Sequence, residues 1–229
     1  MENLYYSDII YLVSFLITLI AQIFVSTSYS RYKKILNSKD NTGYDTARKI
    51  LDKNNLEDVM ILETKGNLTD HYDPKRKVIK LSTDIYHGSS IASAAVAAHE
   101  CGHAIQDKNK YIPMRIRSAI VPFVNICTRL GYLAILIGLI FNRAPLLEAG
   151  IILLLAMLVF QLITLPVEFN ASKRALNELE KEKILDKEEK GNARNMLVAA
   201  AFTYVASVLS TLLQIFRLVL ISSSNDRRR

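Results

Sequence analysis

The sequence predicts a mainly α-helical membrane protein in which transmembrane helices carry a small α+β region. Half of the 229 residues are hydrophobic and the mean hydropathy is +0.16, although 22% of the residues are charged. The apolar residues gather in a few long blocks, which is typical of transmembrane segments. Between the first two blocks, residues 31–115 show both helix and strand patterns.

The basic residues lie mostly between the apolar blocks, and the formal net charge is +7. This distribution follows the positive-inside rule, so the lipid bilayer is an expected partner and a multi-pass position in the cell membrane is expected. No nucleic-acid partner is expected, because no binding motif accompanies the charge. The two cysteines, Cys101 and Cys127, are too few for a disulfide framework.

The first apolar block predicts an N-terminal transmembrane anchor within residues 1–30. Residues 9–27 contain no charge and are numerous enough to span a bilayer. No basic stretch and no small-residue cleavage site mark the block as a cleavable signal peptide. Arg31, Lys33 and Lys34 follow at once, which places this end in the cytoplasm and the N-terminus outside.

Residues 31–115 are expected to form a small cytoplasmic region of helices and strands. Turn signals and caps separate its elements. The expected elements are a helix capped by Asp45 or Thr46 and running to Leu51, a strand at 59–62, an irregular segment at 68–74, an exposed or edge strand at 77–82, and a helix from Ile91 to about Asp107 capped by Ser89 or Ser90.

The last of these helices contains His99-Glu100-Cys101-Gly102-His103, a His-Glu-x-x-His pattern. Helix positions i and i+4 share a face, so both imidazoles can reach one ion. A catalytic zinc takes three protein ligands and keeps one position open for water, and Glu100 can accept a proton from that water. Cys101 points away from such a metal. The alternative is a chance match on an amphipathic helix.

Residues 116–167 predict a transmembrane helical hairpin with a tight connection at 142–145 and an end near Pro166. Arg129 interrupts the first arm. Its side chain either reaches the membrane surface, which is the favoured interpretation, or pairs with Glu148 inside the bundle.

Residues 168–195 predict a charged cytoplasmic helix, because acids and bases alternate at helical spacing. Residues 196–229 predict a last apolar helix followed by a basic tail. A full span would place that tail outside, against the charge rule, so an interfacial or re-entrant helix stays open beside a transmembrane one.

A third metal ligand has to come from outside the signature helix. The other histidines, His71 and His87, lie upstream in turns. A hairpin returns the chain to its starting side, and the first residue there with ligand chemistry is Glu168. Two histidines and one glutamate form an established catalytic set. The alternative for Glu168 is an acid favoured by a helix N-terminus.

Four strings resemble the bacterial family of neutral zinc metallopeptidases known as YugP-type membrane proteins, and the resemblance extends roughly from Tyr44 to the end. The strings are LTDHYDPKRKVIKLS (68–82), SIASAAVAAHECGHAIQ (90–106), TLPVEFNASKRAL (164–176) and RNMLVAAAFTYVAS (194–207). The resemblance implies a Zn²⁺-dependent peptidase with a zincin-like catalytic region.

The chain more distantly resembles membrane zinc proteases that include the prenyl-protein endopeptidase. The resemblance implies Zn²⁺ ligands at His99, His103 and Glu168, and a general base at Glu100. In those relatives an aspartate four residues after the ligand glutamate orients a ligand histidine. Ser172 stands at that position here, so Asn170 or Ser172 has to provide the support.

The expected function is that of a membrane-anchored zinc endopeptidase that hydrolyses peptide bonds of peptide or protein substrates, membrane proteins included, at the cytoplasmic membrane surface. The strand near 78–81 would align the substrate, and His71, Tyr72 and Tyr204 are candidate oxyanion donors. Two alternatives are a non-catalytic membrane scaffold and a protease that cuts within the membrane. Structural zinc sites are usually rich in cysteine, which argues against the scaffold.

Overall fold

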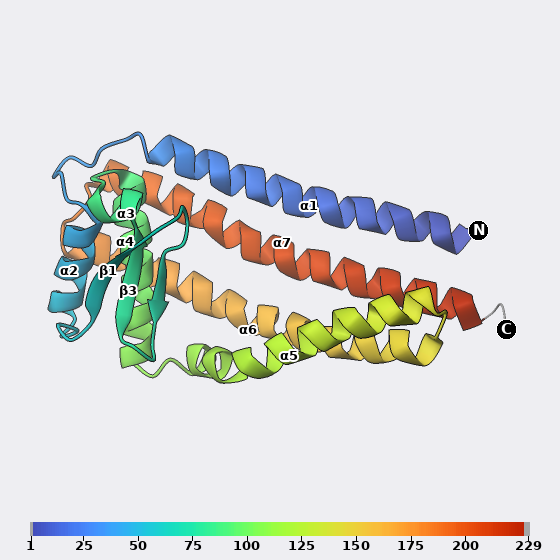
Figure 1. Ribbon diagram of the computed structural model, residues 1–229. Helices are drawn as coiled ribbons and strands as arrows, with labels where there is room; N and C mark the ends of the chain where they lie inside the picture. The colour runs from blue at the N-terminus through green and yellow to red at the C-terminus, as the bar shows by residue number, and fades with distance from the viewer. Residues whose placement is uncertain (1, 227–229) are drawn as a thin grey trace. The chain divides into compact units, whose positions relative to one another are not determined.

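The computed structural model describes residues 2–226, with side chains described for residues 5–223, and it divides into two compact units. The helical unit comprises residues 2–22, 116–165 and 203–226, and the mixed unit comprises residues 23–115 and 166–202. The first contains helices and one turn at 141–143, and the second contains a small sheet with short helices (Figure 1). The predicted class, a mainly helical membrane protein with a small α+β region, is confirmed.

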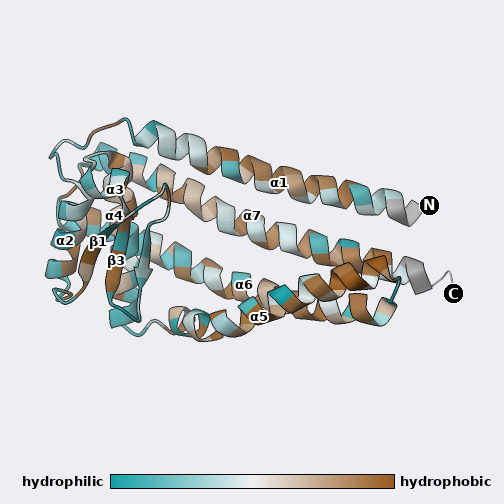
Figure 2. Cartoon of the chain, viewed as in Figure 1, coloured by the Kyte–Doolittle hydropathy of each residue, from teal (hydrophilic) through white to brown (hydrophobic). Residues whose placement is uncertain are grey.

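Four helices in the described part are long and apolar enough to cross a membrane. Each exceeds the roughly 20 residues that a bilayer requires. Figure 2 shows apolar residues along their lengths. They are α1 (Glu2–Tyr32), α5 (Ile112–Ile140), α6 (Ala144–Lys181) and α7 (Lys187–Asp226). Length and composition therefore allow the last apolar block to span.

Small residues bring helices close together within the helical unit. A Cβ added to Gly150 of α6 would lie 2.8 Å from the carbonyl oxygen of Gly131 of α5, so the two backbones touch at glycines. The Ser14 and Ser210 hydroxyls, 2.9 Å apart, join α1 to α7. Arg129 and Glu148 are both exposed and form no ion pair within this described unit, so the alternative of a pair inside the bundle is not observed there.

The mixed unit contains a three-stranded sheet of β1 (Met60–Thr64), β2 (His71–Asp73) and β3 (Val78–Ser82). The strand order is β1-β3-β2, with β1 parallel and β2 antiparallel to β3. The prediction of an exposed or edge strand at 77–82 is therefore wrong, and so is the irregular segment expected where β2 lies. β3 is the central strand, and its Ile79 and Leu81 side chains are fully buried in the core of the mixed unit.

Two short helices of the mixed unit depart from the sequence-based expectation. Helix α2 (Gly43–Lys53) is capped by Thr42, whose hydroxyl accepts a hydrogen bond from the Asp45 backbone N–H at 3.0 Å. The Asp45 carboxylate accepts one from the Thr42 N–H at 3.1 Å, so this acid is the third helical residue of a capping box and the predicted cap at Asp45 or Thr46 is wrong. Helix α3 (Thr83–His87) was not predicted.

The prediction for the signature helix is confirmed, whereas the predicted end of the hairpin's second helix is wrong. Helix α4 (Ile91–Lys108) is confirmed, with Ser90 as its cap. The predicted end near Pro166 is wrong, because α6 continues through that residue to Lys181. Proline removes one backbone hydrogen bond, a loss that membrane helices tolerate. Glu168 consequently lies in the interior of a continuous helix.

Helices α4 and α6 approach each other at a single glycine. A Cβ added to Gly102 would lie 2.5 Å from the Ala171 carbonyl oxygen, which is a backbone atom and cannot move aside cheaply. We expect Gly102→Ala to destabilise the protein by about 1–3 kcal/mol through overpacking and to lower its zinc content. Thermal unfolding and metal analysis measure both effects.

The matched control is Gly191→Ala in α7, where an added Cβ meets nothing within 4 Å. That substitution is expected to be neutral or to stabilise the helix by about 0.5–1 kcal/mol. Equal unfolding temperatures for the two variants would contradict the close approach of α4 and α6.

Candidate metal centre

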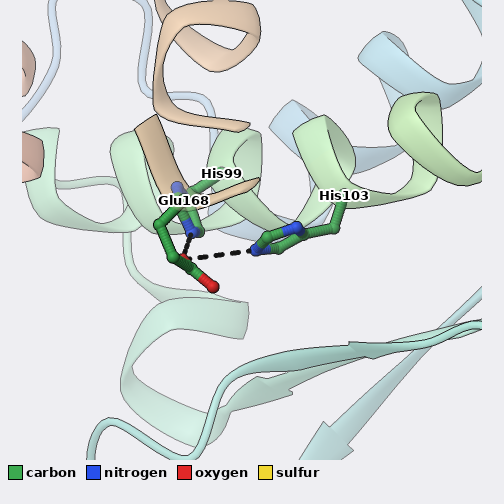
Figure 3. Close-up of side chains that lie close together, drawn as sticks. All are labelled: His99, His103 and Glu168. Carbon is green, nitrogen blue, oxygen red and sulfur yellow. Dashed lines mark hydrogen bonds and ion pairs between the residues drawn. The ribbon is translucent and has the colours of Figure 1, made fainter. Parts of the chain in front are cut away.

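Two adjacent turns of α4 and one turn of α6 bring the three predicted ligand residues together (Figure 3). The Oε2 atom of Glu168 lies 3.2 Å from Nε2 of His99 and 3.6 Å from Nε2 of His103. One ligand atom from each residue lies within 4.8 Å of the other two, which is close enough for one ion to bind all three. The i, i+4 spacing on α4 explains why both imidazoles face the same carboxylate.

The cluster is shielded from solvent. The side chains of His99, His103 and Glu168 are 16%, 9% and 4% exposed, and Glu100 is also buried. Burial by itself lowers the pKa of His103, but its contact with Glu168 and the charge of Glu100 raise that pKa overall. Two buried carboxylates beside two imidazoles form a site that favours a positive ion.

Gln106 fixes the orientation of His103. The Nδ1–H group of His103 donates to the Gln106 side-chain oxygen at 3.0 Å, and the Gln106 amide nitrogen donates to the Val167 carbonyl at 2.8 Å and to Asn170 at 3.0 Å. Because the amide has no freedom to flip, Nδ1 of His103 carries the proton and Nε2 presents its lone pair to the cluster. Gln106 is fully buried.

His99 is supported by Ser172 of α6. The Ser172 hydroxyl lies 3.2 Å from Nδ1 of His99. Asn170 contacts Gln106 and supports His103 only through it. The side-chain oxygen of Asn170 accepts hydrogen bonds from the Gln106 amide at 3.0 Å and from Nε of Arg174 at 2.8 Å. Neutral side-chain oxygens therefore contact Nδ1 of both imidazoles.

Gln106 is the residue of this arrangement that sequence reasoning missed. Its position three residues after His103 places it on the same face of α4, which is a usable signal. The partners that give it a role lie on α6 and could not be identified from spacing along one helix.

We expect Gln106→Ala to weaken zinc binding by about 10- to 100-fold, because His103 loses the acceptor that fixes its tautomer. Zinc titration of the apoprotein against a competing chelator measures this. Asn109→Ala, an exposed amide at the end of the same helix, is the control and should bind zinc as the wild type does. Wild-type affinity in Gln106→Ala would contradict the role assigned to the amide.

The remaining cysteine and histidine candidates lie outside the cluster. Cys101 is fully buried with its Sγ 3.6 Å from the Ala47 carbonyl oxygen, and burial raises the pKa of its thiol. His71 and His87 are exposed; Nδ1 of His71 lies 2.8 Å from the Thr69 carbonyl. Two imidazole nitrogens and one carboxylate oxygen without sulfur fit a catalytic zinc ion.

Two of the three oxyanion candidates, His71 and Tyr72, form contacts with residues outside the cluster. The Tyr72 hydroxyl donates to the Asp107 carboxylate at 2.9 Å, and burial together with that contact raises its pKa. The His71 imidazole contacts the Thr69 carbonyl just before β2. Tyr204, the third candidate, lies on α7. The oxyanion donor therefore stays a prediction.

The fold and the cluster define a helical membrane protein with a candidate zinc site built from two histidines and a glutamate. The family model described as "Putative neutral zinc metallopeptidase" matches residues 7–223, and the chain belongs to this family. The Bacillus subtilis (strain 168) protein named "Putative membrane protease YugP" is 43% identical over 201 residues, which cover 88% of this chain and 89% of that protein. No solved structure matches the chain.

The family membership confirms the resemblance found in the sequence. It also identifies zinc as the cofactor and supports, at a coarse level, a protease in the membrane.

Proposed function

We propose that this protein is a membrane-anchored zinc endopeptidase that hydrolyses peptide bonds at the cytoplasmic membrane surface. The observation that supports it is the convergence of His99 Nε2, His103 Nε2 and Glu168 Oε2, with the buried Glu100 on the same helix. Zinc bound by the three residues would polarise the scissile carbonyl and lower the pKa of a water molecule.

The chain's own residues then have distinct parts in the reaction. Glu100 is the one buried carboxylate of the signature that is not in the ligand set, so it is the proposed acceptor of the water proton and its donor to the leaving amine. Gln106 and Ser172 keep the two imidazoles in the orientation that the metal requires. Burial of the cluster limits competing solvent.

The substrate backbone is proposed to pair with β2. The strand at 78–81 cannot do so, because β3 already pairs with a strand on each side. In this sheet β2 has an open side, and the bond from Tyr72 to Asp107 connects it to the signature helix. An extended peptide can add to such an edge through main-chain hydrogen bonds.

The cytoplasmic location is proposed from charge. Arg31, Lys33 and Lys34 follow the apolar part of α1, and Lys173 and Arg174 follow that of α6. Cys101 is too buried to report on sidedness. Lys75→Cys, in the exposed turn between β2 and β3, should react with a membrane-impermeant thiol reagent in inside-out vesicles and stay unlabelled in intact cells.

The experiment that tests the activity is cleavage of casein and of a defined peptide by the purified full-length protein. We expect internal cleavage with new termini on both products, loss of cleavage after chelation, and recovery on addition of Zn²⁺. Stepwise removal of terminal residues would contradict an endopeptidase. A preparation that binds zinc but never cuts would favour the scaffold alternative.

A protease that cuts within the bilayer is less well supported. The signature helix α4 is not among the four candidate membrane spans of the described chain. It packs with α2, α3 and the sheet in the core of the mixed unit.

A further inference from the structure

The mixed unit contains a groove between the ends of α1 and α7, apart from the metal cluster. Its volume is about 420 Å³. Phe24, Thr27, Ser28, Arg31 and Tyr32 line one side from α1, and Asn195 and Val198 line the other side from α7. The proposed peptidase does not use it.

The lining changes from apolar to basic along α1. Phe24 and Val198 are 45% and 53% exposed at one end, and Arg31 lies two helical turns further along α1. None of the seven lining residues is acidic. A ligand that fits such a groove has an apolar part and a negatively charged part.

Arg31 is available for an anion. The neighbouring Lys33 pairs with the Asp84 carboxylate, but within the described residues Arg31 pairs with no carboxylate. Its guanidinium lies 5.6 Å from the centroid of the Tyr32 ring, which holds it at the groove without neutralising its charge. Planar guanidinium groups bind phosphate oxygens through two parallel hydrogen bonds.

The position of the groove along the chain matches a membrane surface. Phe24 and Thr27 belong to the last turns of the apolar run at 9–27, and Arg31 is the first basic residue after it. In a transmembrane helix this change of residues marks the level of the phosphate groups of the lipids.

We propose that the groove binds one anionic phospholipid of the cytoplasmic leaflet, with the lipid phosphate at Arg31 and Asn195 and the upper part of an acyl chain against Phe24 and Val198. The proposal uses the membrane orientation given above but does not depend on peptidase activity. A bound lipid would join α1 to α7.

The test is native mass spectrometry of the full-length protein from nanodiscs with equal amounts of phosphatidylglycerol and phosphatidylcholine. We expect one phosphatidylglycerol to stay bound preferentially. Arg31→Ala should weaken that binding about fivefold, the effect of one basic residue near a membrane surface. Val198→Trp should displace the lipid by filling the apolar end.

Two matched controls separate the groove from general attraction. Lys34→Ala removes an exposed basic residue that lies three positions after Arg31 but outside the groove. Ile23→Trp adds an indole ring on α1, also outside the groove. Both variants should retain the lipid. Equal losses in Arg31→Ala and Lys34→Ala would overturn the proposal, since they would show unspecific charge attraction. Unchanged lipid binding in Val198→Trp would also overturn the proposal, and so would displacement of the lipid by inorganic phosphate alone. Failure of peptide cleavage leaves these results unaffected.

Discussion

Glu100→Gln is expected to lower the rate of peptide hydrolysis by about 10²- to 10⁴-fold while the protein keeps its zinc. The amide has nearly the shape of the carboxylate but cannot accept the proton of the attacking water. Glu100 is buried on α4 next to His99 and lies outside the ligand set, so the metal site should stay intact. Initial cleavage rates and zinc content of the same preparation measure the two effects together.

The control is Glu188→Gln, which changes an exposed acid in the first turn of α7 and should leave both quantities unchanged. Cleavage at the wild-type rate by Glu100→Gln would show that Glu100 is not the general base. Loss of zinc together with cleavage would instead show that Glu100 contributes to metal binding.

Glu168→Ala is expected to weaken zinc binding by more than about 100-fold, a larger loss than removal of an outer contact such as Gln106 causes. The substitution leaves two imidazoles, and a catalytic zinc site needs three protein ligands. Zinc stoichiometry after dialysis measures the change, and peptide cleavage should be lost with the metal.

Two variants distinguish loss of a metal ligand from misfolding of the protein. Glu168→His supplies a different ligand atom at the same place and should recover part of the zinc, whereas Glu180→Ala removes an exposed acid of α6 and should bind zinc fully. Retention of zinc by Glu168→Ala would mean that the third ligand lies elsewhere.

The signature helix could be predicted from the sequence because its determinants are local. Ser90 as cap, the bounds of α4 and the shared face of His99 and His103 all follow from helical geometry within a few turns. Glu168 lies 69 positions beyond His99, and only the return of a two-helix hairpin, together with the family resemblance, identified it. The structure brings it to the two imidazoles.

The features that could not be predicted depend on contacts between distant segments. The alternation at 77–82 suits an edge strand, but β3 pairs with both β1 and β2, and Ile79 and Leu81 lie in a core that residues of α2 and α4 share. Pro166 usually ends a helix, but α6 continues because the rest of its backbone bonds remain. The support of His103 by Gln106 requires Val167 and Asn170 on another helix.

The most direct test of the central claim is the zinc K-edge X-ray absorption spectrum of the wild-type protein. We expect two imidazole ligands at about 2.0–2.1 Å, with the remaining ligands oxygen at about 2.0–2.2 Å. A sulfur ligand at about 2.3 Å, or a protein that binds no zinc, would contradict a centre made of His99, His103 and Glu168.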